Sequence, residues 1–75
     1  MGKIERIHAM NKRLIREKNL DVGDKLILKR DSHGFKKGKE FTIDHIHSSF
    51  GWITLEESEQ FPQEVKELLK LMRTN

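Results

Sequence analysis

The chain has 75 residues, carries a net charge of +3 and contains no cysteine. This length suits one domain, and the missing cysteine excludes disulfides and cysteine-ligated zinc. A small secreted domain usually needs such crosslinks, so the composition favours the reducing cytoplasm. No stretch approaches the ~18 consecutive apolar residues of a membrane span, and we expect no membrane partner.

Charge is distributed unevenly along the chain. Residues 1–39 hold twelve Lys or Arg and five Asp or Glu, a net charge of +7, whereas residues 40–75 hold three and seven, a net charge of −4. Such asymmetry predicts either an anionic partner for the first half or two halves that attract each other within the fold.

Residues 3–18 have the spacing of an amphipathic helix. Its apolar residues fall within one arc and are Ile4, Ile7, Met10, Leu14 and Ile15. Its basic residues on the opposite side are Arg6, Lys12, Arg13 and Arg16. Asn19 suits the left-handed position that follows a helix, which would let Leu20 contact Ile15.

The middle of the chain predicts short antiparallel strands at residues 25–30, 39–47 and 52–55, separated by a loop over residues 31–38 and a hairpin over residues 48–51. In the second strand Phe41 and Ile43 share one face, but Ile46 has the opposite parity. We therefore expect a bulge near Asp44 and His45 that returns Ile46 to the interior. Residues 56–61 predict a further turn and short strand.

Residues 62–73 predict a C-terminal helix. Pro62 suits the first helical position, where its missing N–H costs nothing. The apolar residues that follow at helical spacing are Val65, Leu68, Leu69 and Met72. The whole chain, residues 1–75, is thus expected to be one α+β domain with a helix at each end.

Residues 20–61 resemble the SH3-like small barrels of uncharacterised phage and prophage proteins. The matching segments are Val22-Gly23-Asp24-Lys25-Leu26, Gly38-Lys39-Glu40-Phe41-Thr42-Ile43, Gly51-Trp52-Ile53-Thr54-Leu55 and the Phe61-Pro62 exit into the last helix. The resemblance covers about half of the chain. It implies an SH3-like barrel of three to five short strands between the two helices, and a phage origin, but no catalytic residue.

A weaker resemblance links residues 22–43 to the KOW motif of ribosomal and transcription-elongation proteins, with basic residues around Gly34 and Gly38. It implies RNA binding. That motif has another glycine near Glu40 or Phe41, which this chain lacks.

The basic face of the first helix is the first candidate for partner binding, through Arg6, Lys12, Arg13 and Arg16. It would contact phosphates or an acidic protein surface. The alternative is a solvated helix face, partly paired with acidic residues such as Glu57 and Glu59. An anionic membrane is a further target for such a helix, but this one carries no aromatic anchor.

Two loops supply the other candidate binding residues. Phe35, Lys36 and Lys37 lie in the loop over residues 31–38, where Phe35 would either meet a partner or anchor the loop in the barrel. Phe50 and Trp52 flank Gly51 in the hairpin, and an exposed Trp52 would anchor a partner. The alternative is that Trp52 packs beneath a helix.

Catalysis and metal binding have little support. The chain shows none of the nucleophile, phosphate-loop, dinucleotide or zinc-protease motifs. His45 and His47 share one face of a strand, but no third ligand lies nearby in the sequence. We expect no enzyme activity, no cofactor, no metal site and no small-molecule substrate.

These features predict a non-catalytic protein-interaction module. If the phage resemblance holds, the partner is a host protein in the host cytoplasm, whose activity the module alters. The alternatives are a basic nucleic-acid-binding accessory protein, suggested by the charge of the first half, and a structural component of a larger assembly.

Overall fold

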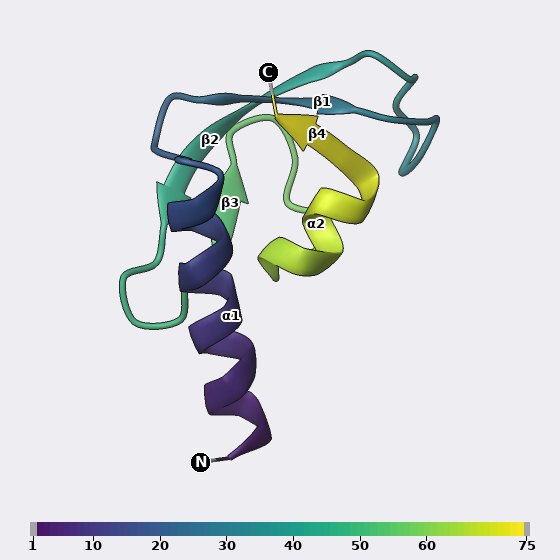
Figure 1. Ribbon diagram of the computed structural model, residues 1–75. Coiled ribbons are helices and arrows are strands. Elements are labelled where there is room, and N and C mark those ends of the chain that lie inside the picture. Colours follow the sequence, from purple (N-terminus) through teal and green to yellow (C-terminus); the bar gives the residue numbers. More distant parts are fainter. Residues whose placement is uncertain (1, 75) are drawn as a thin grey trace.

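The computed structural model describes residues 2–74, so residues 1 and 75 of the predicted domain lie outside the described part. It is a small α+β fold in which two helices accompany an open antiparallel sheet (Figure 1). In chain order the elements are α1 (Lys3–Glu17), β1 (Lys25–Leu28), β2 (Glu40–Ile46), β3 (Ile53–Leu55), α2 (Val65–Leu71) and β4 (Met72–Thr74).

The sheet has the strand order β3-β2-β1-β4. The three predicted strands pair as expected, because β1 pairs with β2 and β2 pairs with β3, all antiparallel. Strands β3 and β4 form the two edges, so the sheet over residues 2–74 does not close into a barrel. The predicted α+β class with two helices and antiparallel strands is thus confirmed, but the sheet is open where a barrel was predicted.

The predicted bulge in β2 is confirmed. Ile43 pairs with Leu55, but the next pair joins His45 to Thr54, so Asp44 is the extra residue. The bulge reverses the side-chain parity beyond it, and Ile46 accordingly packs against the core.

The predicted end of the first helix is also confirmed. Asn19 adopts a left-handed φ of 55°. Its N–H donates to the Arg16 carbonyl at 3.2 Å, and the Leu20 N–H donates to the Ile15 carbonyl at 2.9 Å. These two hydrogen bonds pair carbonyl groups that have no partner within the helix. The chain turns here, and Leu20 is buried in the core.

The C-terminal segment differs from the predicted helix over residues 62–73. Helix α2 begins at Val65, because Gln63 is held by a hydrogen bond from the Ile53 N–H to its carbonyl at 3.1 Å. After Leu71 the chain extends into β4, where Met72 pairs with Leu28 of β1. The unpaired backbone groups at the edge of β1 need partners, and β4 supplies them while Met72 stays fully buried.

The expected strand within residues 56–61 is also absent, since these residues form bends. The core lies between the sheet, α2 and the C-terminal part of α1 (Figure 1). Its buried apolar residues are Leu20, Leu26, Leu28, Phe41, Ile43, Ile53, Leu55, Phe61, Val65, Leu68 and Met72.

The N-terminal half of α1 extends away from the sheet and from α2, whereas its C-terminal half lies against them (Figure 1). Leu14 and Ile15 pack against the core from this second half. Within residues 2–74, neither helix has the length and apolar character needed to cross a membrane.

Candidate functional site

A buried asparagine fixes α1 to the rest of the fold. Asn11 is only 1% exposed, although it lies in the middle of a helix that is otherwise largely exposed. Its Nδ2 donates to the Phe50 carbonyl at 3.1 Å and to Glu64 Oε2 at 2.6 Å, and its Oδ1 accepts from the Val65 N–H at 2.9 Å. One side chain therefore joins α1 to the hairpin and to the start of α2.

The carboxylate of Glu64 completes this network. While Oε2 accepts from Asn11, Oε1 accepts from Trp52 Nε1 at 2.9 Å. Hydrogen bonds to a charged acceptor are about twice as strong as neutral ones. Glu64 is also the N-cap residue of α2, so the N-terminus of α2 is bound to both α1 and the hairpin.

The hairpin backbone lies directly on α1. Gly51 is buried and has a left-handed φ of 68°. A Cβ atom at this position would lie 2.8 Å from Asn11 Cβ and 3.1 Å from the Lys12 backbone nitrogen. Only glycine allows both this conformation and this close approach.

Rings from α1 and the hairpin pack together around Phe50. The His47 ring stacks on Phe50 with centroids 4.5 Å apart, and the rings of His8 and Trp52 each lie 4.6 Å from it. His47 Nδ1 accepts hydrogen bonds from the N–H groups of Ser49 and Phe50, both at 3.2 Å. The structure thus brings the predicted anchors Phe50 and Trp52 together, half-buried beside α1.

The projecting half of α1 carries an apolar stripe, which we define as Ile4, Ile7 and Met10. Ile4 is 67% exposed, and Ile7 and Met10 are each 43% exposed. The stripe continues the face through which Asn11 contacts the body. It is therefore the part of the predicted apolar arc that stays exposed within residues 2–74.

The four residues of the predicted basic face of α1 are all exposed: Arg6, Lys12, Arg13 and Arg16. Arg13 Nε contacts Glu17 Oε1 of its own helix at 2.9 Å. The suggested pairing with Glu57 and Glu59 does not occur. Each ion pair found between residues 2 and 74 joins two residues that lie close in the sequence. The basic first half of the chain and the acidic second half are therefore not linked by direct ion pairs within this range.

Glu57 serves a local structural role instead. Its Oε1 accepts a hydrogen bond from the backbone N–H of Thr42 in β2 at 2.8 Å. Partial burial raises the pKa of Glu57, but hydrogen bonds from backbone N–H groups and the Thr42 hydroxyl, with the charge of Lys25, outweigh it. The pKa of Glu57 is therefore held below its usual value.

The loop over residues 31–38 is anchored through Phe35. Its half-buried ring packs on Phe41 at 5.1 Å and on Phe61 at 5.9 Å. This supports the interpretation of Phe35 as a core anchor. Lys36 and Lys37 remain exposed, and Asp31 contacts Lys36 at 3.6 Å and accepts from the Lys37 N–H at 2.8 Å.

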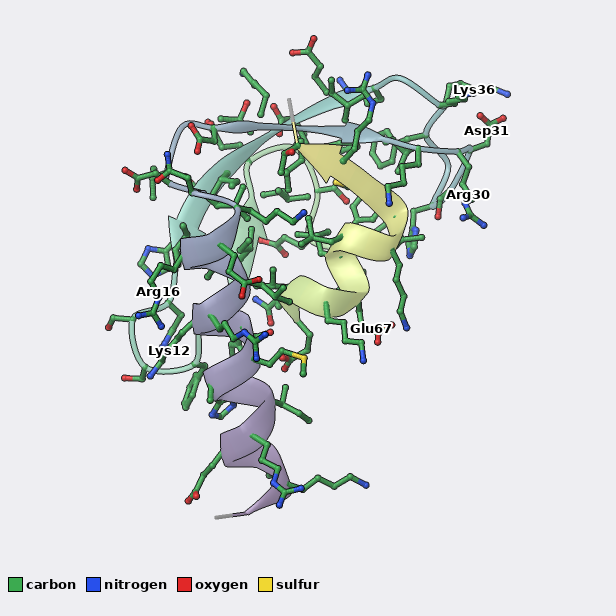
Figure 2. The ribbon with its side chains drawn as sticks, in the orientation of Figure 1. Lys12, Arg16, Arg30, Asp31, Lys36 and Glu67 are labelled. Atoms are coloured by element: carbon green, nitrogen blue, oxygen red, sulfur yellow. The ribbon has the colours of Figure 1, made fainter. Side chains whose placement is uncertain are left out.

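The two predicted basic regions do not form one surface. Figure 2 shows Lys12 and Arg16 beside the hairpin, while Arg30, Asp31 and Lys36 lie at the far end of the molecule. The candidate site residues therefore divide into an α1–hairpin group and a separate loop group.

His45, in β2, and His47, just after it, do not form part of a metal-ligand set among residues 2–74. The ring centroids of His45 and His47 lie 6.3 Å apart. In the described part of the chain, no three His, Cys, Asp or Glu side chains are placed to hold a metal ion together.

Sequence reasoning missed Asn11 and Glu64. The available signal was the position of Asn11 within the apolar arc of the helix, between Ile7 and Leu14. A polar residue on an apolar face usually has a specific hydrogen-bonding partner when buried. Glu64 gave no such signal, because an acidic residue near a helix start is explained by the helix dipole.

Comparison with known proteins identified no matching family model, curated protein or solved structure.

Proposed function

We propose that this chain is a non-catalytic protein-interaction module. The observation that carries the proposal is the apolar stripe on the projecting half of α1. Three large apolar side chains on one helix face remain exposed, while further along the same face Asn11 is buried and Leu14 and Ile15 are half-buried against the core. Contiguous exposed apolar residues of this kind are typical of interaction sites.

The anchoring of α1 supports the same function. Because Asn11 and Gly51 hold the middle of α1 against the hairpin, the helix is presented in a fixed orientation. An isolated helix of this length is marginal in water. A helix that is already ordered loses less conformational entropy on binding.

We also propose narrower assignments that rest on the family resemblance. The open sheet would be a reduced SH3-like barrel, and the bulge at Asp44, which bends β2, supports this. The chain would be phage-encoded and would alter the activity of a host protein in the host cytoplasm.

Nucleic-acid binding is the second candidate function. It is favoured by the exposed cations Arg6, Lys12 and Arg16 along one helix. The affinity would then fall with salt. A plot of the logarithm of the association constant against the logarithm of the salt concentration would have a slope of about −0.9 per phosphate neutralised on duplex DNA. The separation of these cations from Lys36 and Lys37 (Figure 2) works against a continuous nucleic-acid track.

Affinity capture tests the proposal. The immobilised chain is exposed to host lysate at physiological salt, with and without nuclease, and a mobility-shift titration with DNA and RNA runs in parallel. We expect a defined host protein to be retained in both lysates. Retention that nuclease removes, together with submicromolar nucleic-acid binding, would replace the proposal by the second candidate.

A further inference from the structure

We propose that the projecting half of α1 inserts as a helix into an apolar groove with an acidic rim on a different protein. This inference rests on the proposed function and specifies its surface and the chemistry of its partner. It concerns the apolar stripe of Ile4, Ile7 and Met10, not the hairpin aromatics or the loop over residues 31–38.

The spacing of the stripe fits this binding mode. Ile4, Ile7 and Met10 follow one another at intervals of three residues, so they line one face of the helix over about 9 Å of its length. Helices that dock in grooves present anchors at such intervals. The body of the molecule contacts the helix from His8, whose ring lies 4.6 Å from that of Phe50, and holds it at Asn11, which limits the inserted part to the first turns.

The surroundings of the stripe determine the charge of the groove. Residues 2–12 contain the cations Lys3, Arg6 and Lys12, all exposed, against one acidic residue, Glu5. The Glu5 carboxylate is already engaged by the Gly2 N–H at 3.1 Å. The helix dipole adds partial positive charge at the same projecting end. A complementary groove therefore needs carboxylates along its rim.

The same charges argue against a second copy of this chain as the occupant. In an antiparallel pair centred on Ile7, the flank of the stripe that carries Lys3 and Arg6 would face its equivalent. In a parallel pair it would face the other flank, which carries Lys12 and Arg16 and one carboxylate, that of Glu5, already engaged by the Gly2 N–H. Either arrangement opposes mostly like charges, which is destabilising.

Site-specific photocrosslinking tests this assignment directly. The full chain is prepared with benzoylphenylalanine in place of Ile4, and the control carries the same probe in place of Val22. Val22 is a suitable control because it is also apolar and 54% exposed but lies outside α1. Each chain is irradiated in host lysate, and the crosslinked peptides are identified by mass spectrometry.

The expected result is a crosslink from position 4, absent from position 22, to an apolar segment of a host protein flanked by Asp and Glu. With that protein purified, Ile7→Asp should weaken binding at least ~30-fold, as expected for loss of a central anchor. Val22→Asp should leave binding unchanged. Arg6→Glu should weaken binding mainly through slower association. Circular dichroism and the thermal midpoint confirm that each variant is folded.

Several outcomes overturn the inference and are distinguishable from failure of the proposed function. If a host protein is retained but crosslinks from a probe at Lys36 instead of position 4, the inference fails and the interaction function stands. If position 4 crosslinks a second copy, or the mass by sedimentation equilibrium rises in an Ile7-dependent way, the chain pairs with itself. Binding to phosphatidylglycerol vesicles that Ile7→Asp abolishes would assign the stripe to a membrane. Absence of any retained protein overturns both proposals.

Discussion

Asn11 of α1 caps α2, because its Oδ1 accepts the N–H of Val65 at 2.9 Å although the two residues are 54 positions apart. A helix N-cap usually comes from the residue just before the helix. Here Glu64 holds that position but makes no side-chain cap bond. Its carboxylate binds Asn11 and Trp52 instead, so the start of α2 depends on α1.

Asn11→Ala should therefore destabilise the fold. The change leaves the Val65 N–H and the Phe50 carbonyl without their partner, and unsatisfied buried groups cost about 1–3 kcal/mol each. We expect a loss of about 2–4 kcal/mol, measured by urea denaturation. Lys12→Ala, on the exposed side of the same turn, is the control and should change stability by less than about 0.5 kcal/mol. Equal effects of the two variants would contradict the cap.

Trp52→Phe should lower stability and should be coupled to Asn11→Ala. The phenylalanine keeps a ring beside Phe50 but removes the Nε1 donor to Glu64. Since both residues bind one carboxylate, a double-mutant cycle should show a coupling energy of about 0.5–3 kcal/mol. Additive effects would mean that the two hydrogen bonds act independently.

Gly51→Ala should cost more than Gly34→Ala. Both glycines have positive φ values, 68° and 83°, so both alanines suffer backbone strain of about 1 kcal/mol. Only at Gly51 does the added Cβ meet Asn11 at 2.8 Å, whereas nothing lies within 4 Å at Gly34. Thermal unfolding should therefore give Gly51→Ala the lower midpoint. Equal midpoints for the two variants would contradict the close approach of the hairpin to α1.

Glu57→Gln should change how stability depends on pH. The folded pKa of Glu57 lies below the pKa that a glutamate has in the unfolded chain. The stabilisation by the charged form is therefore complete above the unfolded pKa and is lost as the pH falls through the lowered folded pKa. Wild type should exceed Glu57→Gln in stability near neutral pH, and the gap should narrow in acid.

The control for this measurement is Glu59→Gln. Glu59 is exposed and makes no hydrogen bond through its carboxylate between residues 2 and 74. Its removal should leave the pH profile of unfolding close to that of wild type. A constant gap between wild type and Glu57→Gln across the acid range would show that the Thr42 contact does not depend on charge.

Features that depend on neighbouring residues were predictable from the sequence. The parity conflict between Ile43 and Ile46 indicated the bulge at Asp44, and Asn19 indicated the end of α1. Each is decided within a few residues by backbone geometry. Among the candidate site residues, the closeness of Phe50 and Trp52 within one hairpin was predictable for the same reason, whereas their contact with α1 depends on the tertiary fold.

Features that depend on tertiary contacts were not predictable. The helical spacing of Met72 predicted only that it would be buried, as it is, so this spacing could not reveal β4, which pairs with the edge of β1. Likewise, Asn11 finds its partners only when Phe50, Glu64 and Val65 are brought to it. The exposure of Ile7 was hidden because its spacing matches that of core residues.

The division of α1 at Asn11 also has an evolutionary consequence. The second half of the helix is constrained by the core and by the Glu64 network, whereas Ile4 and Ile7 are exposed and lie outside the core. Substitutions at Ile4 and Ile7 can therefore accumulate with little effect on the free energy of unfolding. Under the proposed function, the first half of α1 could change its target by small steps without loss of the scaffold's stability.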